Sequence, residues 1–139
     1  MANPTKTAGR EPVIRVMMMP RDTNANGTIF GGVILSYLDQ AGAVHARQLG
    51  RNCVVTVAMD SVEFKQPVFV GDVLSFYAET LSVGRTSARI RLSVEAERFE
   101  PPCERVAVTA ADIVYVSIGE DRRPVPFRTA ADDQDGARD

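Results

Sequence analysis

The sequence predicts an α+β domain in which one long helix covers one face of an antiparallel sheet. The first observation is a single stretch, from Gly31 or Gly32 to about Leu49, where apolar residues recur at helical spacing. The second is a series of strand-like segments after it, the clearest of which alternates apolar and polar residues between Ala88 and Ala96. One helix cannot cover both faces of a five-strand sheet, so we expect the other face to be polar or to meet another subunit.

The elements follow in order along the chain. A short apolar run at residues 13–19 ends before Pro20 and predicts a first strand. Residues 21–32, with the sequence RDTNANGTIFGG, are rich in Asp, Asn and Gly and predict a loop that leads into the helix. At 1.5 Å per residue that helix would be about 27 Å long, enough to cross a sheet. Four further strands are expected near residues 53–64, 72–83, 87–96 and 105–118.

Length and composition indicate one domain. The chain has 139 residues, of which 45% are hydrophobic, and this is enough for a single core but not for two. We expect the domain to span residues 13–119, with mobile tails at 1–12 and 120–139. A turn at residues 82–85 should join two of the strands as a hairpin.

Charge and composition exclude several classes of partner. The net charge is −2 and basic residues do not cluster, which argues against nucleic acid. No secretory signal or membrane span is evident, so we expect a cytoplasmic protein. The two cysteines, Cys53 and Cys103, have no metal-binding spacing and should be free thiols that are at least partly buried. No metal or cofactor is expected.

The start of the helix and Asp39 are the candidates for chemistry. A helix N-terminus has unpaired N–H groups, and glycines such as Gly31 and Gly32 let a ligand approach them. Asp39 lies about two turns further on, among apolar or small residues, so we expect its carboxylate to be partly buried. From the residues alone, two alternatives remain open: the glycines only permit a tight loop, and Asp39 is a structural or solvated aspartate.

Other catalytic arrangements find little support. His45, the only histidine, lies about 600° of helical rotation beyond Asp39 and does not share its face. Ser36 and Cys53 have no neighbouring general base. Phosphate-loop and dinucleotide-binding fingerprints are missing.

A resemblance to a known family rests on the loop, the helix and several strand motifs. Its residues are 22–32, Leu38-Asp39, Ala41-Gly42, 54–57, Phe64, Pro67, 70–72 and 84–87. With these the chain resembles acyl-CoA thioesterases of the brain-type acyl-CoA hydrolase group, above all their bacterial single-domain relatives. The likeness covers most of residues 13–118. It implies a hotdog fold, in which a curved antiparallel sheet wraps around the long helix.

The resemblance also implies a mechanism and an assembly. Asp39 and Asn24 take the positions of the family's catalytic pair, which comes from opposite subunits of a homodimer. Asp39 would activate a water or attack directly, Asn24 would orient the water or substrate, and the N–H of Gly32 would polarise the thioester carbonyl. Family members often assemble such dimers into hexamers. The only cofactor-like molecule would be coenzyme A, as part of the acyl-CoA substrate.

Two further assignments follow from the same likeness. Arg85, Thr86 and Ser87 match a segment that often contacts the nucleotide end of coenzyme A, although such a sequence is also a good hairpin turn. Many family members have His before the Gly31-Gly32 pair, where this chain has Phe30. Phe30 cannot donate a hydrogen bond from its side chain, and we expect it to line the acyl channel instead. Gly31 would border the substrate as well.

Three other functions stay open at this point. An acyl-thioester hydratase or dehydratase would share the fold but usually needs a histidine beside a carboxylate, and His45 is badly placed for that role. A non-catalytic CoA-binding module would not need both Asn24 and Asp39. An aryl-CoA thioesterase would differ only in the shape of its pocket.

Overall fold

The computed structural model describes residues 9–50 and 53–127. The strands are β1 (Ile14–Met17), β2 (Cys53–Phe64), β3 (Val73–Val83), β4 (Ser87–Glu97) and β5 (Arg105–Ile118). A short 3-10 helix, η1 (Pro20–Asp22), and one long helix, α1 (Gly31–Gln48), stand between β1 and β2. Both the order of the elements and the position of the helix are as the sequence predicts.

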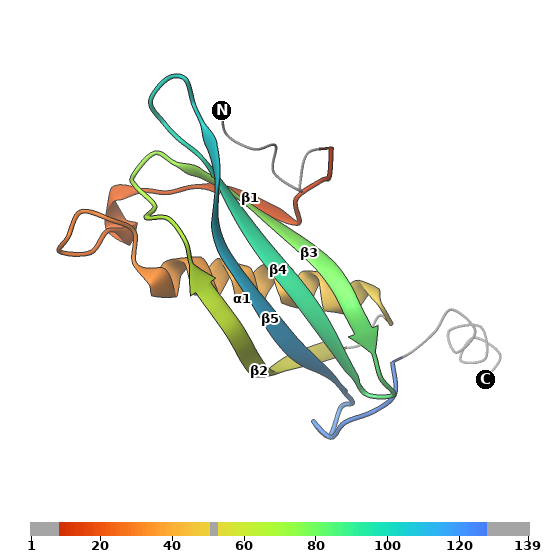
Figure 1. Ribbon diagram of the computed structural model, residues 1–139. Helices are drawn as coiled ribbons and strands as arrows, with labels where there is room; N and C mark the ends of the chain where they lie inside the picture. Colours follow the sequence, from red (N-terminus) through yellow and green to blue (C-terminus); the bar gives the residue numbers. More distant parts are fainter. Residues whose placement is uncertain (1–8, 51–52, 128–139) are drawn as a thin grey trace.

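The five strands form one antiparallel sheet in the order β1-β3-β4-β5-β2. Helix α1 crosses one face of this sheet, and the long strands curve over it (Figure 1). β2 follows the helix in sequence but pairs with β5, so it forms one edge of the sheet. The predicted α+β architecture is confirmed.

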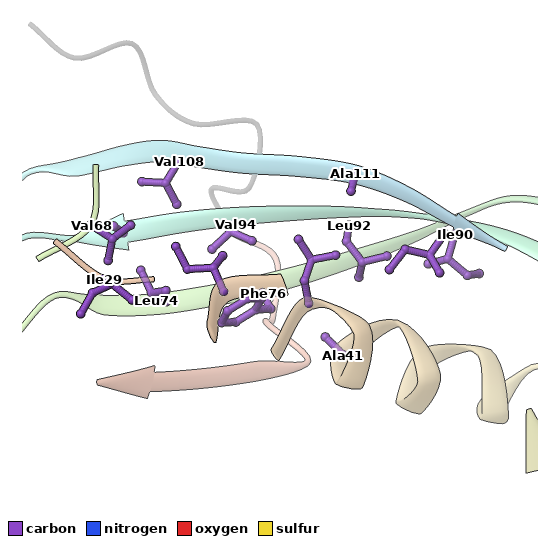
Figure 2. Close-up of a cluster of buried hydrophobic side chains, with 14 of the residues drawn as sticks. Ile29, Ala41, Val68, Leu74, Phe76, Ile90, Leu92, Val94, Val108 and Ala111 are labelled. Atoms are coloured by element: carbon purple, nitrogen blue, oxygen red, sulfur yellow. The ribbon is translucent and has the colours of Figure 1, made fainter. Parts of the chain in front are cut away.

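The core lies between α1 and the sheet because apolar residues alternate along the strands. Figure 2 shows Ala41 of the helix below Leu92 and Ile90 of β4, with Phe76 of β3 beside them. On the opposite face of β4, Arg89 and Arg91 pair with Asp112 of the adjacent strand β5, and Arg89 also pairs with Asp60 of β2. The face that the helix leaves uncovered is therefore polar in this region, as expected. The largest fully buried side chains are Tyr115, Phe76, Met18, Leu38, Leu74, Ile90, Leu92, Ile113, Val68, Val94, Val108 and Asp72.

The packed part of the chain extends past the expected end of the domain at residue 119. Val125 N–H donates to Ser117 O at 2.9 Å, and Phe127 packs against the core. At the other end, Arg10 donates to the backbone of β3 and lies over the Tyr77 ring. Residues 1–8 and 128–139 of the two expected tails lie outside the described residues.

The two cysteines are more exposed than the sequence predicts. Cys53 and Cys103 are free, but both are exposed. Cys53 begins the edge strand β2, and Cys103 lies in the loop between β4 and β5, where little packs over a side chain. Within the described residues no helix is long and apolar enough to cross a membrane.

Candidate active site

Asp39 lies in the middle of α1 and turns toward β2 and β5. Its Oδ1 atom accepts a hydrogen bond from Thr56 Oγ1 of β2 at 2.6 Å and another from the Tyr115 hydroxyl of β5 at 3.1 Å. Thr56 and Tyr115 are partners in the register of the two strands, so their hydroxyls reach the same atom. The Asp39 side chain is half-buried, as the sequence predicts.

The two oxygens of Asp39 have different environments. Oδ1 takes both hydroxyl donors, whereas Oδ2 receives no hydrogen bond from any described residue. An ionised carboxylate oxygen is a strong acceptor, and one without a protein donor is free to accept from water or substrate. The carboxylate is thus anchored through one oxygen and available through the other.

Strand β2 is locally irregular where it meets Asp39. Its register with β5 shifts between Thr56 and Ala58, and a second shift follows between Asp60 and Glu63. Such irregularities re-aim side chains near sites and at sheet edges. The first of them directly follows the residue that bonds Asp39.

The loop before α1 is closed by Asn24. Its Oδ1 accepts from the backbone N–H of Asn26 at 2.9 Å and of Thr28 at 3.2 Å. Its Nδ2 donates to Thr28 Oγ1 at 2.9 Å. An amide nitrogen has two N–H groups, so one donor remains after this bond. Within one chain no hydrogen bond joins Asn24 to Asp39 among the described residues.

The helix begins with an open approach to its first N–H groups. Gly31 and Gly32 form the first turn of α1, after Phe30 at the N-cap. First-turn N–H groups have no acceptor within the helix. A Cβ at Gly32 would meet no atom within 4 Å, so its backbone faces open space. Gly32 also lines a surface hollow of about 430 Å³, together with Asp22 and Tyr37.

A second hollow, of about 300 Å³, opens on the other side of the helix start. We call it the Phe64 pocket, because Phe64 is its largest side chain and packs closely over Gly31, where a Cβ would lie 3.2 Å from the ring. Gly31 borders this pocket. Phe30 does not line it, and its side chain is 52% exposed. The lining residues are Thr28, Ile29, Gly31, Ile34, Phe64, Lys65, Gln66, Pro67 and Val68.

The hairpin that contains Arg85, Thr86 and Ser87 lies at the opposite end of the sheet from the helix start (Figure 1). Gly84 N–H donates to Ser87 O at 2.7 Å, which closes the turn. The carbonyls of Arg85 and Thr86 accept from the chain after β5 and at its end. Within one chain, this hairpin is therefore remote from Gly31, Gly32 and Asn24.

His45 is not part of the Asp39 cluster. Its Nε2 lies 2.8 Å from Thr80 Oγ1 of β3, on another side of the helix. Burial, followed by the positive charge of Arg10, lowers the pKa of His45 below its ordinary value. Across residues 9–50 and 53–127, no group of three or more His, Cys, Asp or Glu side chains could hold a metal ion.

Helix geometry separates Asp39 from the glycines of its own chain. Gly32 and Asp39 are seven residues apart, which corresponds to about 10 Å along the axis. A carbonyl oxygen bonded to Gly32 N–H must be about 3 Å from it, and a water bonded to the acid is as close to Asp39. Within one chain, a ligand atom next to the Gly32 N–H is therefore remote from a water next to the Asp39 carboxylate.

Two residues at the site escaped the sequence reasoning. Thr56 lies within a segment that carries the family resemblance, but nothing in its strand pattern distinguishes it as a partner of Asp39. Tyr115 is 76 positions from Asp39 and is one apolar-strand residue among several. Only the pairing of β2 with β5 brings these two hydroxyls together over the helix.

The fold and the site together define the class of protein. A curved five-strand antiparallel sheet around one long helix, with a carboxylate held between them, is a hotdog domain with the features of a hydrolytic site. Comparison with known proteins makes the assignment more specific. The sequence model of the Thioesterase superfamily matches residues 26–100, and the chain belongs to this family.

Individual relatives agree with this assignment. Acyl-CoA thioester hydrolase YciA of Salmonella typhimurium is 39% identical over 129 residues, which cover 91% of this chain and 97% of the relative. A hexameric hotdog fold thioesterase of Campylobacter jejuni superimposes with a TM-score of 0.81 at 40% identity, covering 91% of this chain and 96% of that one. A hexameric thioesterase from Yersinia pestis gives 0.80 at 37% identity, with 86% and 96% covered.

Proposed function

We propose that this protein hydrolyses acyl-CoA thioesters to a free carboxylic acid and coenzyme A, with a water activated by Asp39 at an interface between two subunits. The single observation that carries the mechanism is the asymmetry of the Asp39 carboxylate. Two hydroxyl donors hold Oδ1, and Oδ2 has no donor among the described residues. The acyl-CoA substrate is supported by the relatives, which are named acyl-CoA thioester hydrolases at about 40% identity.

The chemistry needs one base and one oxyanion donor. Asp39 Oδ2 takes a proton from the water as the water oxygen attacks the thioester carbon. The carbonyl oxygen becomes negative and is stabilised by the N–H of Gly32 at the open helix start. One such donor contributes about 3 kcal/mol to the transition state. The carbon–sulfur bond then breaks, and the proton held by Asp39 passes to the leaving thiolate.

The separation of Gly32 and Asp39 along one helix is the reason for two subunits. In this proposal the acid of one subunit meets the helix start and Asn24 of the partner subunit. The spare N–H of that amide orients the attacking water or the substrate. Asp39 also lies beneath the edge strand β2, so a second copy placed along this edge would approach it directly.

The exposed edge of β2 supports a homodimer. β2 is 12 residues long, pairs with β5 alone among the described strands, and carries exposed apolar side chains such as Val55, Val57 and Phe64. A long apolar edge strand invites pairing with another chain. We therefore propose that two copies join along β2, and that such dimers assemble further, as in the hexameric thioesterases of Campylobacter jejuni and Yersinia pestis.

Two regions of the protein bind different parts of the substrate. Its acyl chain enters the Phe64 pocket, which lies beside the helix start and combines apolar side chains such as Ile34 and Val68 with the polar Thr28, Lys65 and Gln66. Phe30, exposed at the N-cap, covers the mouth of the acyl channel in the assembled protein. Arg85, Thr86 and Ser87 contact the nucleotide end of coenzyme A, and Arg85 supplies the positive charge for its phosphates. This hairpin reaches a site only through a neighbouring subunit. No further cofactor is required, and the enzyme acts in the cytoplasm.

A thiol-release assay with a panel of acyl-CoAs tests the proposal. The wild type is expected to release coenzyme A, and Asp39→Ala should lose turnover by orders of magnitude while it remains folded. Turnover that survives this substitution would contradict the mechanism. Hydration of an enoyl-CoA without thiol release would indicate the hydratase, and binding of coenzyme A without either reaction would indicate a non-catalytic module.

A further inference from the structure

We infer that Tyr115 is a positioning residue, which fixes the Asp39 carboxylate so that Oδ2, and not Oδ1, takes the proton from water. This inference rests on the proposed function, because it assigns a role within the same site. It adds a residue of β5 to a mechanism that otherwise depends on the helix and the loop before it.

The Tyr115 hydroxyl makes two contacts with one residue. It lies 3.1 Å from Asp39 Oδ1 and 2.9 Å from the Asp39 main-chain oxygen. A donor shared by the carboxylate and the backbone of the same residue ties the side chain to one orientation. Thr56 then holds the same oxygen from the adjacent strand at 2.6 Å. Rotation of the carboxylate would break both contacts at once.

Helix α1 has a gap that fits this hydroxyl. Gly42 lies three residues after Asp39, and a Cβ at this position would overlap the Tyr115 hydroxyl and lie 2.7 Å from Cζ. Glycine is a poor helix former in the interior of a helix. Gly42 is found in the fourth turn because the Tyr115 hydroxyl approaches the helix closely there and leaves no room for a larger residue.

The environment keeps Tyr115 a donor. The residue is fully buried, and its burial, followed by the Asp39 charge and hydrogen bond, raises the pKa of the phenol above its ordinary value. The hydroxyl therefore stays a protonated donor at neutral pH. A neutral donor holds the carboxylate in place and does not compete for the proton of the water.

The test compares Tyr115→Phe with Tyr77→Phe. Tyr77 is another buried tyrosine of the sheet, on β3, and its substitution removes the same atom away from Asp39. Tyr115→Phe should lower kcat about tenfold or more and leave KM within about twofold, because the acyl pocket is unchanged. Tyr77→Phe should change neither. Equal kcat in the two variants, or a parallel change of kcat and KM in Tyr115→Phe, would overturn the inference.

A second variant covers the case in which Tyr115→Phe does not fold. Trifluorotyrosine at position 115 keeps the hydroxyl and nearly the same shape, but it ionises at lower pH. Once ionised it cannot donate and repels Asp39, so kcat should decline at an alkaline pH where the wild type still holds a plateau. A plateau as wide as that of the wild type would contradict the role of Tyr115.

The Asp39→Ala variant distinguishes a failure of the proposed function from a failure of the inference about Tyr115. If it keeps its turnover, the proposed function fails and the role of Tyr115 fails with it. If Asp39→Ala is inactive while Tyr115→Phe matches Tyr77→Phe, the proposed function stands and only the positioning role is wrong.

Discussion

Thr56 and Tyr115 face each other across β2 and β5, and both donate to the same oxygen of Asp39. The contact is possible because the helix carries Asp39 under the sheet at the point where these strands pair. The acid that the sequence identifies is thus held by two residues that the sequence does not identify. The arrangement leaves its second oxygen without a hydrogen-bond donor among the described residues.

Removal of the Thr56 hydroxyl should impair catalysis. Thr56→Val keeps the shape of the side chain but deletes the 2.6 Å donor to Asp39, so kcat should fall about tenfold with a small change in KM. Thr56→Ser keeps a hydroxyl and should restore most of the rate. Steady-state kinetics of the three proteins decide the matter, and a Thr56→Val enzyme as fast as the wild type would show that this hydrogen bond is only structural.

Two glycines of α1 should respond differently to alanine. At Gly42 a methyl group would overlap the Tyr115 hydroxyl, so Gly42→Ala should cost about 1–3 kcal/mol of unfolding free energy, as overpacked cores do. At Gly32 the added methyl group meets open space and alanine favours the helix, so Gly32→Ala should be as stable as the wild type or more so. Urea denaturation measures both, and equal stabilities would mean that Tyr115 does not approach the helix closely.

Phe64 should limit the length of the acyl chain. Phe64→Ala removes the largest side chain from the pocket beside Gly31 and opens room for further methylenes, each worth about 1–3 kcal/mol in discrimination. The ratio of kcat/KM for long to short acyl-CoAs should therefore rise about tenfold or more. Phe99→Ala, at a phenylalanine that is 69% exposed and not in the pocket, serves as the control. A ratio unchanged in Phe64→Ala would place the acyl chain elsewhere.

His45 should make the stability of the protein sensitive to acid. Burial and the Arg10 charge lower the pKa of this side chain in the folded state. The unfolded chain therefore binds a proton at His45 more readily than the folded chain does. The contribution of neutral His45 to the free energy of unfolding is complete above about pH 6.5, and it is lost as the pH falls through the pKa of His45 in the folded state. The melting temperature of the wild type should drop more between pH 7.5 and 5.5 than that of His45→Gln. Identical drops would contradict this.

Local patterns in the sequence predict most of the fold. The interval of α1 follows from helical spacing, and the bounds of β2 and β5 follow from runs of β-branched residues ended by proline and glycine. The strand at β1 is shorter than the apolar run from residue 13 to 19, because only Ile14–Met17 pair with β3. Residues 120–127 have no apolar periodicity, and their return to the sheet depends on backbone bonds that no pattern reports.

The site could be predicted only in part. Asp39 and the glycines of the helix start are close in sequence, and their positions follow from helix geometry. The contacts of Asp39 with Thr56 and Tyr115 span 17 and 76 positions and depend on β2 crossing to the far edge of the sheet. Phe30, expected in the acyl channel, does not line the pocket of a single chain, because its side chain turns outward at the N-cap.

The central claim, a site shared between two subunits, is tested most directly by mixing two inactive variants. Asn24→Ala and Asp39→Ala are each expected to lack activity as pure proteins. In a mixed dimer one site carries both substitutions and the other carries neither, so co-refolding equal amounts should restore about a quarter of the wild-type rate. A mixture that stays as inactive as its two components, although mass spectrometry detects mixed dimers, would contradict the account.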